Sequence, residues 1–251
     1  MNRKWIGIVA LCLALAGWCP GAEPLRIMSW NLHHGAGVDG KVDLERIAAV
    51  IRREEPDVVL LQEVDKHCAR SGNTDQAAEL GRLLEMHHAF GKALDLGDGE
   101  YGQAILSRHP LGDPEVHRLP GGGEPRIVFS CRVDAPGGSL TAATLHLDHQ
   151  DDGRRFAQAQ VASAELLKTN GPVVLGGDFN AGPESRTLRV FAQAPWNPVP
   201  KAGPAATHPA ENPATEIDHI ILRGLAPAKA VVVIDESAAS DHRPLLVEIR
   251  R

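Results

Sequence analysis

Six predicted strands of this 251-residue chain carry acid, amide or imidazole side chains at one end. The stretch at 176–180 reads GGDFN, and it follows the apolar run PVVL. The polar residues at the strand ends are Asn31, Glu63, His146, Asp178, Asn180, Asp218, His219, Asp241 and His242. Neighbouring strand ends gather their side chains at one edge of a sheet, where binding sites usually form. The sequence therefore predicts that these groups share one site.

Carboxylate and amide oxygens are the ligands that a hard divalent cation prefers. Oxygen ligands beside histidines favour a Mg²⁺ or Mn²⁺ site with a proton-transfer group over a structural zinc site. The cation would stabilise a departing oxyanion, and a histidine with a pKa of about 6.5 can donate or accept a proton. This combination suits the hydrolysis of a phosphate ester. Taken singly, each residue has a simpler explanation: Asn31 in a turn, Glu63 in a cap or ion pair, and His146 in the core.

Apolar patterns predict the elements that must position these residues. We expect helices at 43–55, 75–86 and near 153–168, the first two capped by Asp43 and Asp75. We expect strands at 25–32, 57–63, 101–107, 126–133, 140–147, 172–178, 217–222, 230–235 and 244–250. Helices separate the early strands, and closely spaced strands fill the middle of the chain. This mixture indicates two sheets with helices outside rather than one doubly wound sheet. The Pro- and Ala-rich stretch 194–214 is expected to be a long surface loop of the same domain.

The N-terminus has the pattern of a secretory signal. Arg3 and Lys4 precede an apolar run from Trp5 to Ala16 that is too short for a membrane span. We expect a signal peptide over residues 1–22, cleaved after Ala16 or Ala22, and a single domain over 23–251. The protein would then be secreted or periplasmic. A lipid anchor at Cys19 is not expected, because bulky Trp18 precedes it.

Charge and cysteine content limit the partners. Removing residues 1–22 takes away two basic residues and no acid, so the net charge changes from −6 to −8. Such a chain has no general attraction to nucleic acid or to an anionic membrane. Cys68 and Cys131 remain, and an oxidising compartment would allow but not require a disulfide between them. We expect a monomer without a transmembrane span.

Seven stretches in order resemble the endonuclease/exonuclease/phosphatase superfamily, which includes pancreatic-type DNases. They are MSWNLHHG, LLQEVD, YGQAILSRHPL, TLHLDH, GGDFNAGP, IDHIIL and SDHRPLLVEI, and they span residues 25–250. The resemblance implies a four-layer α/β/β/α sandwich, with mixed or antiparallel sheets, that works as a metal-dependent hydrolase. Gln103 and His219 depart from the residues that relatives often carry, and neither departure removes a catalytic group.

The resemblance also implies roles. Asn31 and Glu63 would hold the metal, with Asp241 as a further carboxylate on the metal side. Asp178 would orient or deprotonate the attacking water. His242 would touch the phosphate, held by Asp218.

Four further roles follow from the same resemblance. Asn180 would steady a phosphate oxygen, and His146 matches a second histidine of the DNase-like members. Tyr101 matches an aromatic residue near the phosphate, and Arg126 matches an arginine that approaches it. At the end of the GGDFN strand, the two glycines are expected to let the backbone approach the ligand.

The sequence thus predicts a secreted phosphoesterase that uses Mg²⁺ or Mn²⁺ and attacks a phosphodiester in line with water. Whether Asp178 or His242 takes the proton of the water stays open. The alternatives are a non-specific or repair-type nuclease, a lipid headgroup phosphodiesterase, and a binding module without catalysis. Negative charge and few aromatic residues disfavour the nuclease, and the weakly apolar 194–214 stretch disfavours the lipid enzyme.

Overall fold

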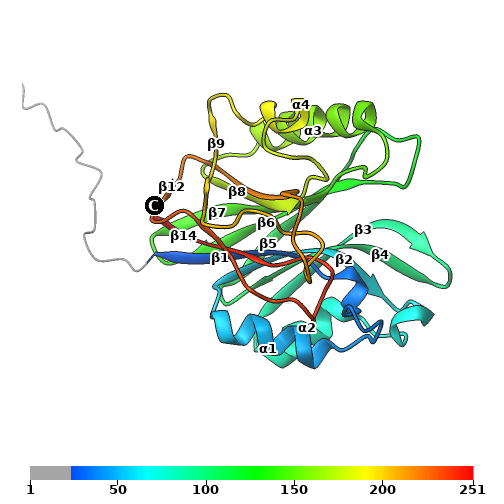
Figure 1. The fold of residues 1–251 in the computed structure, drawn as a ribbon. Coiled ribbons are helices and arrows are strands. Elements are labelled where there is room, and N and C mark those ends of the chain that lie inside the picture. Colours follow the sequence, from blue (N-terminus) through cyan, green and yellow to red (C-terminus); the bar gives the residue numbers. More distant parts are fainter. Residues whose placement is uncertain (1–23, 251) are drawn as a thin grey trace, which may run out of the picture.

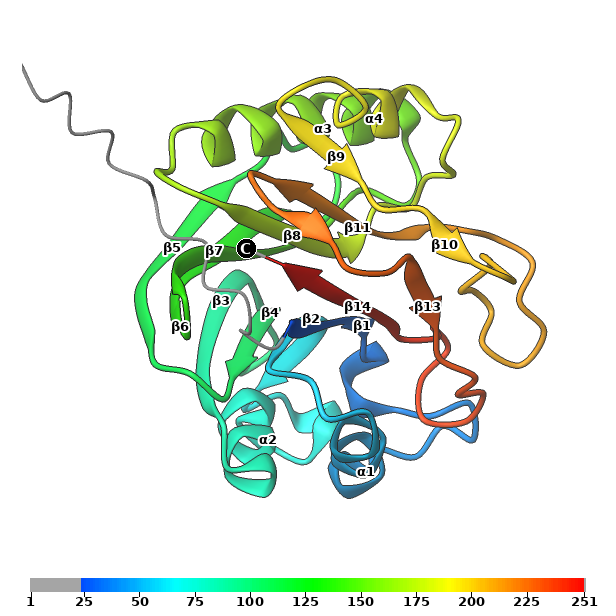
Figure 2. The same cartoon turned by 90° about the vertical axis from the view of Figure 1, so that its left-hand side faces the viewer.

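Two mixed β-sheets pack face to face, and helices cover their outer faces (Figure 1). The computed structural model describes residues 24–250, so the predicted signal segment lies outside the described residues. Helices α1 (Leu44–Glu54) and α2 (Gln76–Leu84) cover one sheet, and α3 (Asp152–Leu167) and α4 (Arg186–Arg189) cover the other (Figure 2). This arrangement confirms the predicted α/β/β/α sandwich. Among residues 24–250, no helix is long and apolar enough to cross a membrane.

The larger sheet has eight strands in the order β10-β13-β14-β1-β2-β4-β3, with β12 paired to β14. They are β1 (Leu25–Asn31), β2 (Val58–Lys66), β3 (His87–Leu96), β4 (Gly99–Ser107), β10 (Lys201–Ala202), β12 (Ala226–Pro227), β13 (Val231–Val233) and β14 (Leu245–Arg250). Two 3₁₀ turns, η1 (His33–Gly35) and η2 (Ala69–Ser71), follow β1 and β2.

The smaller sheet has six strands in the order β5-β6-β7-β8-β11-β9. They are β5 (Leu111–Arg118), β6 (Ile127–Ala135), β7 (Gly138–His146), β8 (Val173–Asp178), β9 (Trp196–Pro198) and β11 (Asp218–Arg223). A parallel pair lies inside each sheet, β1 with β2 and β7 with β8. The two pairs bring together the strand ends that carry the polar motifs.

The N-caps of the first two helices are the aspartates that the sequence predicts. The Asp43 side chain accepts a hydrogen bond from the backbone of Arg46, and Asp75 accepts one from Ala78, so both predicted N-caps are confirmed. The α1 helix ends at Glu54, before Pro56. Its apolar face, which includes Ile47 and Ile51, is buried against the larger sheet.

The glycines of the GGDFN strand serve packing, which differs from our expectation. A Cβ on Gly176 would lie 2.8 Å from the Leu60 side chain and from the Cβ of Ser29, both in the facing sheet. A Cβ on Gly177 would lie 2.2 Å from the carbonyl oxygen of Leu145 in β7. Approach to a ligand is therefore the wrong explanation, because both positions are filled by protein. These glycines let the two sheets, and the strands β7 and β8, come close together.

Two full strands were missed by the sequence patterns. Strands β3 and β5 each lie at one edge of a sheet. Edge strands tolerate charges and proline; β5 contains Pro114, and most of its residues are exposed. The stretch 194–214 is also not only a loop, because it contains β9 and β10. Its tryptophan, Trp196, is buried and donates a 2.8 Å hydrogen bond to the hydroxyl of Ser163 in α3.

Candidate active site

Strand register brings the predicted polar residues together. In the smaller sheet, Asp178 lies directly beside His146 on one neighbouring strand and beside Asp218 on the other. In the larger sheet, Asn31 ends β1 next to β2. The side chains of Asn31 and Asp178 meet across the two sheets, with Nδ2 of Asn31 3.2 Å from Oδ2 of Asp178. The predicted common site therefore lies where the two sheets meet at one end of the sandwich.

Glu63 reaches this site through a bulge. The sequence predicted Glu63 at the end of its strand, and this is wrong, because β2 continues to Lys66. The pairing of β2 with β4 shifts between Leu61 and Val64, and Glu63 has a φ of 54°. A bulge re-aims a side chain, and a residue other than glycine with positive φ indicates a specific local constraint. The carboxylate accepts a 3.0 Å hydrogen bond from Nδ2 of Asn31.

His242 is held by a buried carboxylate. Its Nδ1 lies 2.9 Å from Oδ2 of Asp218, which also accepts a 2.5 Å hydrogen bond from the hydroxyl of Thr207. Burial alone would lower the pKa of His242, but Asp218 and then Asp178 raise this pKa to about 10. His242 is therefore an imidazolium at neutral pH, with its proton on Nδ1 directed at Asp218. Its Nε2 faces Asp178 at 3.7 Å.

Asp178 lies between two histidines at the centre of the site. Its Oδ2 is 3.4 Å from Nε2 of His146 and 3.7 Å from Nε2 of His242. Burial raises the pKa of the Asp178 carboxyl to about 7, against the opposing charge of His242. Burial and then Arg126 lower the pKa of His146 well below 6.5, so His146 is neutral at pH 7. Asp178 thus titrates near neutral pH, in the range that suits a proton acceptor.

Asn180 follows Asp178 and, like Asp178, lines a cavity that opens over the site. Its φ is 50°, a left-handed conformation that asparagine tolerates. Its backbone N–H donates to Oδ1 of Asp178 at 2.8 Å, and its Nδ2 donates to the carbonyl of Leu147 at 3.0 Å. One N–H of the side-chain amide is left for a ligand. Phe179, between the two, is fully buried in the core, as the alternation along an extended chain requires.

The donor set around Glu63 fits a hard cation in part. Glu63 is a partly exposed carboxylate that lines the cavity, and Mg²⁺ is commonly bound by one or two protein carboxylates together with waters and phosphate oxygens. Asn31 presents its amide nitrogen to Glu63 and Asp178, while its Oδ1 accepts a hydrogen bond from the backbone of His33. Asn31 therefore positions Glu63 in this conformation, and its amide has to turn before the oxygen can bind a cation.

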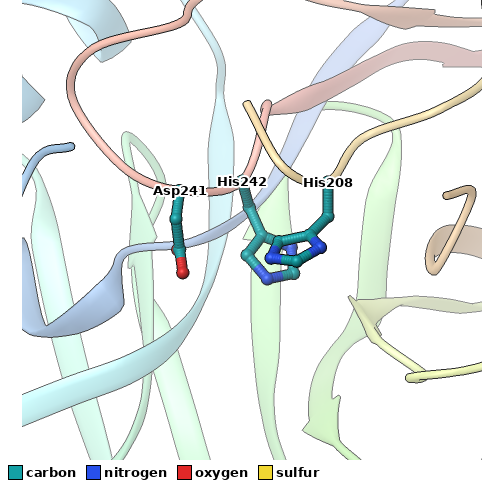
Figure 3. A group of neighbouring side chains, drawn as sticks. All are labelled: His208, Asp241 and His242. Carbon is teal, nitrogen blue, oxygen red and sulfur yellow. The ribbon is translucent and has the colours of Figure 1, made fainter. Parts of the chain in front are cut away.

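Asp241 lies beside His242, away from the cavity lining. Figure 3 shows His208 with its ring against that of His242, while Asp241 projects on the other side. The ring centroids of the two histidines are 4.7 Å apart. Donor atoms of these three residues lie within 4.8 Å of one another, so they are a group that could hold a metal. His208 comes from the 194–214 stretch, and no feature of its local sequence predicted this position.

A cavity of about 270 Å³ opens over the site. Its walls include Glu63 and six residues predicted for catalysis or phosphate binding: His146, Asp178, Asn180, His242, Tyr101 and Arg126. Asn31, Asp218 and Asp241 do not line it. Burial raises the pKa of the Tyr101 hydroxyl well above 10, so the hydroxyl stays protonated.

Sequence reasoning missed Arg70 and His149 in the cavity wall. Arg70 lies in the η2 turn after β2, and His149 lies in the loop after β7. His149 is the last residue of the motif TLHLDH, which was a signal for it. His219, by contrast, is not in the cavity. It packs on Phe179 with ring centroids 5.5 Å apart, and its Nε2 lies 2.9 Å from the carbonyl of Ala181.

Cys68 and Cys131 are both free and buried in the structure. The sequence left open whether these two cysteines form a disulfide, and in the structure both are thiols. Burial raises the pKa of both thiols, to about 12 for Cys131. Neither lines the cavity.

Comparisons with known proteins agree with this geometry. Residues 28–242 match the model of the Endonuclease/Exonuclease/phosphatase family. The chain is 26% identical to the uncharacterized protein YbhP of Escherichia coli (strain K12), over 89% of this chain and 95% of YbhP. It superposes on a crystal structure of an endonuclease/exonuclease/phosphatase from Beutenbergia cavernae, with a TM-score of 0.76 and 26% identity, over 91% of this chain and 72% of the other. A mannosyl-6-phosphatase from Bacteroides thetaiotaomicron shares the fold, with a TM-score of 0.76 and 18% identity, over 90% and 100% of the two chains.

Proposed function

The chain belongs to the endonuclease/exonuclease/phosphatase family, and we propose that it hydrolyses a phosphodiester with the help of a divalent cation, by in-line attack of water. The observation on which this rests is Asp178, buried between His146 and His242, with Asp218 fixing His242 at 2.9 Å. One carboxylate that titrates near neutral pH thus lies beside one permanent cation, and the two can act on one phosphate.

Asp178 acts as the general base in this proposal. Its carboxyl has a pKa raised to about 7 by burial, so it can accept a proton from water near physiological pH. His242 has a pKa of about 10 and already holds its proton, so it cannot serve as the base at neutral pH. It would instead donate a hydrogen bond from Nε2 to a phosphate oxygen and stabilise the developing charge. The proposal therefore assigns the base to Asp178, where the sequence left Asp178 and His242 as alternatives.

The remaining side chains bind and orient the phosphate. The free N–H of Asn180, the guanidinium of Arg126 and the hydroxyl of Tyr101 are donors toward the cavity. His146 is neutral and lies between two carboxylates. Its Nδ1 is 3.8 Å from Oε1 of Glu63, and its Nε2 is 3.4 Å from Oδ2 of Asp178. A Mg²⁺ or Mn²⁺ ion held by Glu63, with Asn31 and Asp241 as the further proposed ligands, would polarise the phosphate and neutralise the departing oxygen.

The volume of the cavity supports a small phosphate ester as the substrate. About 270 Å³ is enough for one phosphate and a compact organic group, and is below the usual range for drug-sized ligands. The phosphatase among the structural neighbours acts on a small sugar phosphate, according to its name. The net charge of −6 gives no general attraction for nucleic acid.

A substrate panel tests the function. Bis-p-nitrophenyl phosphate, p-nitrophenyl phosphate, plasmid DNA, RNA and sphingomyelin are each incubated with Mg²⁺, Mn²⁺ or EDTA. We expect hydrolysis of bis-p-nitrophenyl phosphate with either cation, none in EDTA, and a loss of at least about 10²-fold in an Asp178→Asn protein. Metal-dependent binding of a phosphorylated ligand without any turnover would instead make the protein a binding module.

We further propose that the protein is exported as a monomer after its signal peptide is cleaved following Ala16 or Ala22. The motif of Arg3 and Lys4 before an apolar run supports this. Expression of the full chain in a Gram-negative host, followed by fractionation and intact-mass analysis, tests it. A mature protein that starts at Gly17 or Glu23 outside the cytoplasm is expected, and a full-length cytoplasmic protein would contradict the proposal.

A further inference from the structure

The cavity wall also contains residues that the proposed hydrolysis does not use, and we call this part of the wall the distal arm. It consists of Arg70, Leu94 and Leu96, which lie next to Tyr101 in the cavity wall. Leu94 pairs directly with Tyr101 across strands β3 and β4, and the Arg70 guanidinium lies 5.5 Å from the centre of the Tyr101 ring. The hairpin and the η2 turn thus place one cation and an apolar wall next to each other. Nothing in the hydrolysis of the phosphate itself requires this region.

Arg70 is fixed before any ligand arrives. Its Nε and Nη2 donate to the two carboxylate oxygens of Asp65 at 2.8 and 2.7 Å. Asp65 is fully buried, and the hydroxyl of Ser71 donates to it at 2.8 Å. Burying one member of an ion pair costs desolvation energy and is weak evidence of a stabilising role. The Asp65 carboxylate therefore serves to hold a guanidinium in one orientation at the cavity wall.

The Arg70 side chain keeps donors for a ligand. Its exposed fraction is 42%, although Asp65 is fully buried. Among the described residues, Nη1 of Arg70 has no hydrogen-bond partner, since all its contacts with Asp65 use Nε and Nη2. A planar guanidinium with one edge fixed and the other free suits an anionic group with two oxygens.

Arg126, which the proposed function places at the scissile phosphate, shows that the same cavity lacks an acceptor for a buried guanidinium N–H. It lies in the same cavity, is only 4% exposed, and its buried Nε has no hydrogen-bond partner. Its other contacts are Oε1 of Glu124 at 3.1 Å and Nδ1 of His149 at 3.3 Å. Buried polar groups are nearly always hydrogen-bonded, so an unpaired guanidinium N–H beside a cavity indicates a ligand with acceptor oxygens.

From these contacts we propose that the distal arm binds a second anionic group, a carboxylate or a phosphate, of a small phosphoester whose scissile phosphate lies at Asp178 and His242. Arg70 is the specificity-determining residue, and Leu94 and Leu96 contact the carbon skeleton between the two anionic groups. Naming the ligand a substrate depends on the proposed function, whereas the preference for a second anion can be measured without turnover.

Binding of matched ligand pairs tests the proposal. Isothermal titration with Mg²⁺-loaded Asp178→Asn protein compares glycerol 3-phosphate with 3-phosphoglycerate, and fructose 6-phosphate with fructose 1,6-bisphosphate. The first pair differs in a carboxylate and the second in a phosphate. We expect the doubly anionic member of at least one pair to bind about tenfold tighter or more. In the Asp178→Asn/Arg70→Met protein this ratio should fall to within about twofold.

A control arginine and a second variant make the result specific. Arg82 is exposed, forms a 2.7 Å ion pair with Glu79 and does not line the cavity, so Arg82→Met should leave the ratio unchanged. Because Arg70→Met leaves Asp65 buried without its partner, the pair Arg70→Met/Asp65→Asn removes both charges if the single variant does not fold.

The outcomes separate this proposal from the function. An anion preference that persists without Arg70, or no preference in the starting protein, would overturn the proposal even if the enzyme hydrolyses phosphodiesters. An Arg70-dependent preference in a protein that hydrolyses no ester would support anion binding by the distal arm and refute the proposed function.

Discussion

The pKa of His242 depends most on Asp218, and Asp218→Asn is therefore the sharpest test of the proposed roles. Asp218 heads the groups that raise this pKa from 6.5 to about 10, a difference of roughly 5 kcal/mol. Asparagine keeps the size of the side chain and removes the charge. We expect the His242 pKa to fall to about 6.5 or below in the variant.

The magnitude follows from the charged fraction of His242. At pH ~8.5 an imidazole with a pKa of about 10 is about 97% charged, whereas one with a pKa of about 6.5 is about 1% charged. If the imidazolium binds the phosphate, the variant should lose about 100-fold in kcat at pH ~8.5 through this effect. At pH ~5.5 both proteins hold the proton, and the same effect should be smaller than about twofold. The defect should therefore grow as pH rises.

Two measurements decide the question. Turnover of bis-p-nitrophenyl phosphate in Mg²⁺ is followed from pH ~5.5 to ~8.5 for both proteins, and the imidazole of His242 is titrated by NMR in EDTA. Thr207→Val is the matched control, because it removes the 2.5 Å hydroxyl contact with Asp218 but keeps the charge, and its ratio to wild type should not vary with pH. A ratio for Asp218→Asn that is the same at every pH would refute the role of His242 as a cation, whatever the total loss.

Three further substitutions test cation binding by Glu63, the pH-dependent contribution of Asp148 to stability, and the packing between the two sheets at Gly176. Glu63→Gln keeps a hydrogen-bond acceptor but removes the charge, and should weaken Mn²⁺ binding in a titration by at least about tenfold; unchanged affinity would exclude Glu63 as a ligand. Hydrogen bonds from Arg154 and two backbone N–H groups outweigh burial and lower the pKa of Asp148 from 3.8 to about 2, so its contribution is present above pH 3.8 and lost as pH falls through about 2. Asp148→Asn should cost about 2 kcal/mol of unfolding free energy in urea at neutral pH, and the two proteins should converge toward pH ~2. Gly176→Ala places a Cβ 2.8 Å from atoms of the facing sheet and should cost about 1–3 kcal/mol in urea unfolding, whereas Gly121→Ala, with no atom within 4 Å, should cost nothing measurable.

The sequence predicts those parts of the site that depend on strand register. His146, Asp178 and Asp218 each lie at an end of an apolar strand, and adjacent register places them side by side. Their proximity follows from a period-two pattern and an edge shared by neighbouring strands. For the same reason the two-sheet sandwich was predictable from the order of helices and strands.

Features that depend on local irregularity were not predictable. Glu63 was expected at a strand end, but a bulge inside β2 directs it into the site. Edge strands β3 and β5 have more exposed residues than the central strands, so their apolar pattern is weak. Arg70 sits in a short 3₁₀ turn, and only its pairing with buried Asp65 shows where its guanidinium lies. His208 approaches His242 from a long, irregular segment whose path depends on the whole fold.

Water attack at phosphorus is the central claim, and oxygen isotope transfer tests it most directly. Purified protein is incubated with bis-p-nitrophenyl phosphate and Mg²⁺ in ¹⁸O-labelled water, beside the Asp178→Asn protein and an EDTA control, and the products are weighed by mass spectrometry. We expect one ¹⁸O atom in each p-nitrophenyl phosphate formed, none in p-nitrophenol, and little product in either control. Label in p-nitrophenol, or undiminished product in EDTA or with Asp178→Asn, would contradict it.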